Sequence, residues 1–325
     1  MKTGKHAYAI ILIAALLLIM TACSSSQNPS MSSEPSSQSE TANGSGSSAP
    51  SAQPEAATKT IKDGLDREVE IPTRPEKMVV LGNMGEVLSL GIKPIGTNDY
   101  YLNKFEPERM AGIASVGGDE PSMEKILDLE PDLIIIPSYF KPEIVEALHK
   151  IAPTIATKWG LLPREHLSVL AEWLGREAEE QTWLAQYADK AAQTKEALKP
   201  FHLEGEKAIV LQFWNKSIYQ HATTVFTPLF EDIGFIPTDA QSKVTESKGI
   251  SEEAVVDYAA DADRLFILVD GQNDIDMYQQ LKETAWKNIP AVQNDKVMLV
   301  ESARWNDYST AAMEWMLEDL VKLIK

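Results

Sequence analysis

The sequence has few of the residues from which proteins build metal sites and covalent cross-links. Its 325 residues include one cysteine, Cys23, which excludes a disulfide within the chain, and five histidines that nowhere pair at helical spacing. The acidic segment 270–276 lacks the closing glutamate of a calcium loop and is interpreted as a polar turn. We therefore expect no metal ion held by protein side chains.

Basic residues are also in deficit. The chain has 30 lysines and arginines against 48 aspartates and glutamates, which gives a formal charge of −18. Nucleic-acid binding requires a basic surface, so we expect no nucleic-acid partner.

Motifs of the common enzyme classes are missing as well. The sequence contains no Gly-x-Ser-x-Gly elbow, zinc-protease histidine pair, P-loop or dinucleotide fingerprint. We expect a protein that is not an enzyme. A surface hydrolase, which would turn over an ester, is the competing class. A purely adhesive or sensory protein, which would bind no small molecule, is a third.

The longest apolar run lies at the N-terminus. Residues 7–20 are apolar and follow Lys2 and Lys5, a pattern typical of a signal peptide over 1–22, because a membrane span requires about 20 apolar residues. The run ends in Met20-Thr21-Ala22-Cys23, which resembles the lipobox of bacterial lipoproteins. The resemblance implies a diacylated Cys23 that anchors the chain on the outer face of the cytoplasmic membrane. An ordinary secretory cleavage site is the alternative.

A polar segment follows the cysteine. Residues 24–58 are rich in Ser, Pro, Gly, Gln, Asn and Glu, with almost no large apolar residue. Such a segment cannot bury enough apolar surface to offset its ordering entropy, so we expect 23–58 to be a disordered tether.

The remaining chain alternates strand and helix patterns. Short β-branched runs such as 77–82 and 132–137 predict buried strands between helices, and that alternation indicates parallel sheets covered on both faces. Residues 176–200, bounded by Gly175 and Pro200, predict one long helix. The fold class is therefore α/β, with a first lobe over 59–175 and a second over 201–325.

Six segments, in order, resemble the siderophore- and cobalamin-binding class of ABC-transporter binding proteins. The segments are Val79–Leu81, Leu88–Gly96, Ser122–Ile136, Ile151–Thr154, Leu229–Phe235 and Trp286–Val292. The resemblance covers the chain from about Pro75 to the C-terminus and implies two Rossmann-like lobes joined by one long helix, the class III periplasmic-binding-protein fold. The surroundings of Tyr100-Tyr101, Trp214 and Trp305, with the run Glu177–Ala188, resemble the ferric hydroxamate branch.

The ligand is expected between the lobes, at the carboxyl ends of the parallel strands, as in open α/β sheets. The loops concerned are 83–86, 98–102, 117–119 and 138–141 in the first lobe, and 213–217, 241–243, 271–273 and 302–305 in the second. Aromatic rings there offer flat apolar faces with polar edges, and an arginine offers a forked donor pair to the oxygens around iron. The candidate ligand-binding residues are Tyr100, Tyr101, Tyr139, Trp159, Trp214, Arg304 and Trp305. Each of these rings could instead be part of the core.

The resemblance also implies the partners. An Fe(III)-siderophore brings its own iron ligands, so no cofactor is expected, and a monomer would deliver it to an ABC permease in the same membrane. Glu124 and Glu253 match the two glutamates that dock such proteins on the permease, with Glu252 as a rival for Glu253. Glu124 and Glu253 also lie in the first turns of predicted helices, where the positive end of the helix dipole stabilises a carboxylate. Cobalamin or haem is the alternative ligand.

Overall fold

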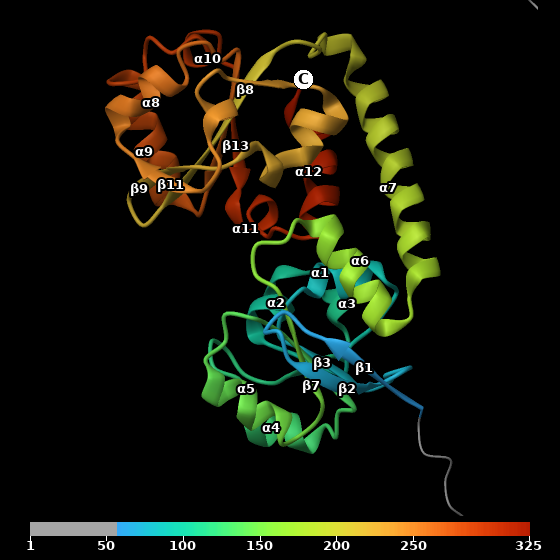
Figure 1. Cartoon of the computed structure of the whole chain (residues 1–325). Coiled ribbons are helices and arrows are strands. Elements are labelled where there is room, and N and C mark those ends of the chain that lie inside the picture. Colours follow the sequence, from blue (N-terminus) through green and yellow to red (C-terminus); the bar gives the residue numbers. More distant parts are fainter. Residues whose placement is uncertain (1–56) are drawn as a thin grey trace, which may run out of the picture. The chain divides into compact units, whose positions relative to one another are not determined.

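The computed structural model describes residues 57–325 (Figure 1). The predicted signal peptide, Cys23 and almost all of the predicted tether lie outside the described residues. Among the helices of residues 57–325, none has both the length and the hydrophobicity that crossing a bilayer requires.

The first lobe, from β1 to α6, is built on a parallel sheet of five strands in the order β5-β4-β3-β6-β7. These strands are β3 (Met78–Val80), β4 (Gly96–Thr97), β5 (Ala114–Ser115), β6 (Leu133–Pro137) and β7 (Thr154–Thr157), and an antiparallel hairpin of β1 (Thr58–Lys62) and β2 (Glu68–Pro72) precedes them. The helices are α1 (Met84–Ser89), α2 (Asp99–Lys104), α3 (Pro107–Met110), α4 (Met123–Asp128), α5 (Pro142–His149) and α6 (Pro163–Leu174). Every residue of β6 is buried, because helices cover both faces of the sheet.

One long helix, α7 (Glu177–Leu198), connects the lobes. It begins two residues after Gly175, whose positive φ of 64° ends α6 in a conformation that favours glycine. A turn of 3-10 helix, η1 (Lys199–Phe201), follows it. The helix predicted over 176–200 is confirmed, and its hydrophobic side packs against α6 and α12 (Figure 1).

The second lobe, from β8 to α12, has a mixed sheet in the order β11-β9-β8-β12-β13, with β10 beside β8. The strands are β8 (Lys207–Trp214), β9 (Ser217–Gln220), β10 (Ile236–Pro237), β11 (Lys248–Ile250), β12 (Arg264–Val269) and β13 (Val297–Glu301). Strands β8, β10, β12 and β13 run parallel, β9 is antiparallel to β8, and β11 is antiparallel to β9. A two-residue turn joins β8 to β9, and its residues Asn215 and Lys216 both have positive φ, as tight hairpin turns require.

Five α-helices and three short helical turns complete this lobe. They are η2 (Thr223–Phe226), η3 (Pro228–Ile233), η4 (Gln241–Lys243), α8 (Glu252–Tyr258), α9 (Gln272–Glu283), α10 (Pro290–Gln293), α11 (Ser302–Trp305) and α12 (Thr310–Leu323). The segment 225–234 is a 3-10 turn followed by a π-type turn instead of one continuous helix, because Pro228 lacks the N–H that a continuous helix needs.

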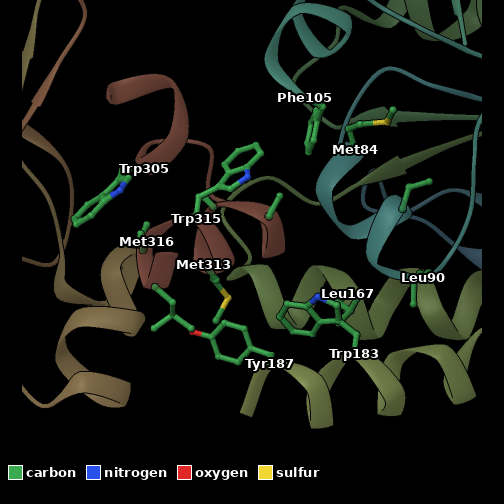
Figure 2. Close-up of a cluster of buried hydrophobic side chains, with 14 of the residues drawn as sticks. Met84, Leu90, Phe105, Leu167, Trp183, Tyr187, Trp305, Met313, Trp315 and Met316 are labelled. Carbon is green, nitrogen blue, oxygen red and sulfur yellow. The ribbon is translucent and has the colours of Figure 1, made fainter. Parts of the chain in front are cut away.

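The largest hydrophobic cluster contains residues of both lobes and of α7. Figure 2 shows part of it, with Met84 of α1, Leu90 directly after α1, Trp183 of α7, and Met313 and Met316 of α12. Phe105 and Trp315 bring the first and second lobes into direct ring contact, with centroids 5.2 Å apart. Separate clusters fill the opposite face of each sheet. The predicted α/β class, with two mostly parallel sheets and one connecting helix, is confirmed.

Candidate functional site

Three exposed aromatic side chains gather at the carboxyl end of the first sheet. Tyr139 follows β6, Trp159 follows β7 and Tyr100 lies in α2 after β4, with exposed fractions of 62%, 67% and 56%. The rings of Tyr139 and Trp159 meet edge to face with centroids 5.1 Å apart. Burial raises the pKa of Tyr139, and the nearby Tyr100 adds to the shift, which places the two phenols in one neighbourhood. We call these three residues the first-lobe aromatic cluster.

Local hydrogen bonds fix the loops that carry this cluster. The Trp159 amide donates to the Ser138 hydroxyl over 2.9 Å, and the buried His166 ring donates through Nε2 to the Lys158 carbonyl, also over 2.9 Å. Asn98 caps α2 by accepting from the Tyr101 amide at 3.0 Å. The exposed rings are therefore held on ordered turns that continue the strands.

Tyr101 turns away from this surface. It is half-buried and packs against the main hydrophobic cluster, with Phe105 as a ring neighbour at 6.2 Å. Burial, followed by the charge of Asp307, raises the pKa of its phenol well above the usual value. Its ring supports Tyr100 from behind, with centroids 5.2 Å apart, rather than offering a face to a ligand.

Trp214 is the exposed aromatic of the second lobe. It ends β8 at the hairpin, is 50% exposed, and contacts Tyr219 of β9 edge to face at 5.7 Å. The structure therefore leaves this predicted residue available to a ligand, on a lobe different from that of the first-lobe aromatic cluster.

The structure places Trp305 and Arg304 differently from the predicted ligand-binding position. Trp305 has no exposed surface: its ring packs on Phe266 at 5.5 Å and its indole N–H donates to Asp319 of α12 over 3.1 Å. The Arg304 guanidinium donates to Asp319 and to Glu318 and lies 5.0 Å from the ring centre of Trp315. Both side chains point back onto α12 because its carboxylates satisfy them, so they support the fold instead of meeting the ligand.

A buried polar network that the sequence does not predict lies behind the second-lobe surface. Gln212 donates through Nε2 to Ser302, so its Oε1 accepts from Nε2 of His221 at 3.0 Å. Nδ1 of His221 is then an acceptor, and the hydroxyls of Ser247 and Tyr308 approach it at 2.6 and 3.2 Å. Burial lowers the pKa of His221 to about 4, so the ring is neutral at pH 7. The Ser247 and Tyr308 hydroxyls thus share one acceptor nitrogen and also lie within hydrogen-bond reach of each other.

No sequence signal could have found this network. Its members come from β8, from the residue after β9, from the loop before β11, from the start of α11 and from the segment before α12, and their spacing matches no motif. Only the folded sheet brings them together.

An ion pair joins the lobes beside the aromatic cluster. Lys104 of α2 pairs with Asp307, and the two side chains are only 4% and 6% exposed. Lys104 also donates to the Tyr100 hydroxyl over 2.6 Å and lies 4.8 Å from the centre of that ring. Burial raises the pKa of Asp307 more than the Lys104 charge lowers it. The position of Tyr100 is therefore tied to the contact between the lobes.

The two predicted docking glutamates lie on the surface. Glu124 and Glu253 are exposed in the first turns of α4 and α8, which Ser122 and Ser251 cap. A backbone hydrogen bond, followed by the Ser251 hydroxyl, lowers the pKa of Glu253. Glu252 is exposed in the same turn.

Neither a metal cluster nor a deep cavity marks the site. Within residues 57–325, no group of three His, Cys, Asp or Glu side chains is placed to hold a metal ion. Two shallow hollows lie elsewhere on the first lobe, one beside β2 and His149 and one beside Leu88 and Arg109. Neither includes a tyrosine or tryptophan at a strand end, so we place no ligand in them.

Comparison with known proteins identifies the family. The model of the periplasmic binding protein family matches residues 89–303. The chain belongs to the periplasmic binding protein family. This confirms the resemblance found in the sequence, and the arrangement of two α/β lobes around α7 is that family's fold.

Individual members of the periplasmic binding protein family support this assignment. The iron(3+)-hydroxamate-binding protein FhuD of Bacillus subtilis (strain 168) is 28% identical over 330 residues, covering 98% of this chain and 96% of that protein. The transcriptional activator Btr of the same organism is 28% identical over 254 residues, but this chain spans only 47% of its length. The structure of unliganded FhuD2 from Staphylococcus aureus covers 83% of this chain and matches over its full length, with a TM-score of 0.70 and 20% identity, which shows the shared fold.

Proposed function

We propose that this chain is the extracellular substrate-binding lipoprotein of an ABC importer, which binds an Fe(III)-siderophore of the hydroxamate type and delivers it to the membrane permease. The observation that carries the proposal is the first-lobe aromatic cluster at the carboxyl end of the first sheet. Three rings that are each more than half exposed present flat apolar faces and polar edges, which suit the carbon skeleton and the oxygens of a chelate. The full-length similarity to FhuD supports the same ligand class.

The charge of the site favours hydroxamates over more anionic chelates. Lys104, beside Tyr100, and Arg304, in α11, are each engaged by carboxylates. The hydroxyls of Tyr308 and Ser247 are neutral donors near the second-lobe surface. A ferric trihydroxamate carries little or no net charge, whereas a ferric tricatecholate or citrate complex is strongly anionic and would need unpaired cations. The siderophore fills the coordination sphere of the iron, so the protein supplies no metal ligand.

Tryptophan fluorescence tests the ligand assignment. Of the seven tryptophans, Trp159 and Trp214 are 67% and 50% exposed and the other five are at most 8% exposed. We expect a ferric trihydroxamate to quench the emission saturably, with a smaller amplitude in Trp159→Phe and in Trp214→Phe. Trp173→Phe, which changes a buried tryptophan of α6, is the control. Saturable binding of a corrinoid or haem without binding of any ferric chelate would favour the alternative ligand, and turnover of an ester would favour a hydrolase.

Delivery to the permease is proposed to use Glu124 and Glu253, one on each lobe. Replacing both with alanine should leave ligand affinity unchanged and abolish cellular uptake, because the exposed carboxylates take no part in the folded core. Glu143→Ala, which changes an exposed glutamate in the first turn of α5, is the matched control. Normal uptake in the double variant would refute this docking assignment.

Anchoring is proposed to use lipid on Cys23. In a Cys23→Ser variant the protein should leave the membrane fraction, because no acyl chain can be attached. Retention of this variant at the membrane would contradict lipid anchoring. Sedimentation of the purified protein would test the expected monomer.

A further inference from the structure

A second feature of the fold joins the lobes next to the ion pair. Helix α1 of the first lobe packs on the start of α12, more than 200 positions later in the sequence. Glu86 accepts from the Thr310 amide over 3.0 Å, and the hydroxyls of Ser89 and Thr310 are 2.9 Å apart. The approach is so close that a Cβ at Gly85 would lie 2.7 Å from the Ser309 hydroxyl oxygen. We call this contact the α1–α12 junction.

The carboxyl group of Glu86 is enclosed in this junction. The residue has no exposed surface, and within the described residues its Oε2 has no hydrogen-bond partner. An ionised carboxylate needs donors on both oxygens to compensate for its lost hydration, and Oε2 of Glu86 has none within the described residues. The neutral, protonated carboxyl is therefore the form that this enclosure favours.

Two of the groups that face Glu86 also favour its protonated form. Asp307, from the segment between α11 and α12, adds a second negative charge, and Tyr101 of α2 adds a phenol. Lys104, which pairs with Asp307, is engaged by that carboxylate. The Glu86 backbone amide, the Thr310 amide and Asn83 oppose the effect by favouring the charged form. The balance, dominated by burial, raises the pKa of Glu86 to about 8.

We infer that the lobes are joined by a proton-linked junction: Glu86 carries a proton while α1 and α12 are in contact and releases it when they separate. In the separated state water solvates the carboxylate, so its pKa returns toward the ordinary value of 4.5. Separation therefore becomes more favourable as the pH rises, by up to about tenfold per pH unit between the two pKa values. Above the higher of the two values the effect levels off.

The ligand site is directly linked to this junction. Asp307 lies beside Glu86 and pairs with Lys104, which in turn donates to the hydroxyl of Tyr100. Loss of the Glu86 proton places a second negative charge beside Asp307 and loosens the contact that holds Lys104. Alkaline conditions therefore favour the separation of α1 from α12.

Hydrogen exchange at the Thr310 amide tests the inference without any ligand, so the result is independent of the proposed function. The amide donates to Glu86 and exchanges when the junction opens. After correction for the intrinsic exchange rate, its protection should fall about tenfold per pH unit between pH values of about 5 and about 8. In Glu86→Gln, which is neutral at every pH, this dependence should disappear, while the exposed control Glu143→Gln keeps it. Equal pH profiles in wild type and Glu86→Gln, or a flat profile in wild type, would overturn the inference.

A second measurement decides the matter if Glu86→Gln does not fold. The glutamate side-chain carboxyl carbons of the ¹³C-labelled wild-type protein can be titrated by NMR. One carboxyl should have its midpoint far above the ordinary range. If every glutamate titrates near the ordinary value, Glu86 holds no proton at neutral pH and the junction is not proton-linked.

Discussion

Replacing Lys104 with alanine should destabilise the protein strongly, because it leaves a buried charge without its partner. Lys104 and Asp307 are 4% and 6% exposed, so the remaining carboxylate cannot recover its lost interaction from water. Removing one partner of a buried pair costs about 3–5 kcal/mol. Burial already raises the pKa of Asp307, and the loss of Lys104 raises it further. Asp307 is protonated at low pH, so the penalty should be larger at pH 7 than at pH 5.

Urea unfolding at these two pH values measures the effect. Alongside Lys104→Ala, the double variant Lys104→Met with Asp307→Leu removes both charges and should recover most of the lost stability, since no unpaired charge remains. The control is Lys62→Ala, which breaks an exposed pair with Asp66 and should leave the free energy of unfolding essentially unchanged. A loss below about 1 kcal/mol for Lys104→Ala, the range of exposed pairs, would refute the reasoning.

Three further substitutions follow from the contacts described. Arg304→Ala should lower the free energy of unfolding, measured by urea unfolding, by about 2 kcal/mol through the loss of its carboxylate contacts. In a fluorescence titration it should reduce siderophore affinity less than Trp214→Ala does. Gly85→Ala should lower the free energy of unfolding by about 1–3 kcal/mol, because the new Cβ forces the α1–α12 junction apart. The control Gly118→Ala, whose new Cβ would meet no atom closer than 3.8 Å, should leave thermal unfolding nearly unchanged. Tyr308→Phe removes one donor near His221 and should raise the Kd for a ferric trihydroxamate about tenfold without lowering the melting temperature. An unchanged Kd would exclude a contact between the Tyr308 hydroxyl and the ligand.

The elements that the sequence predicts well are those with strong local signals. The buried run 132–137 forms β6, Ser122 caps α4 as its position before an acidic residue indicates, and Gly175 marks the boundary before α7. The exposure of Tyr100, Tyr139, Trp159 and Trp214 is also in line with chain order, because the first three follow strands of the first sheet and Trp214 ends β8 of the second. Their contact with a ligand stays a prediction.

The errors concern side chains whose surroundings come from a distant part of the chain. Trp305 and Arg304 follow a strand in the expected place, yet the carboxylates of α12 turn them inward. The segment 83–86 is predicted to be a ligand loop, but most of it starts α1, and Glu86 is buried by residues near Thr310. Local sequence contains no information on such long-range contacts, and hydropathy would place a glutamate at the surface.

Helix α12 follows all the other described elements along the chain, and the junction with α1 depends on it. Until Thr310 and Asp307 have been synthesised, Glu86 and Lys104 lack the groups that enclose them, and α1, α6 and α7 lack the surface on which they pack. A chain cut short after β13 would expose this hydrophobic surface and carry two unmatched charges. A chain that includes α12 can therefore bury its main hydrophobic cluster, whereas a chain that lacks α12 cannot.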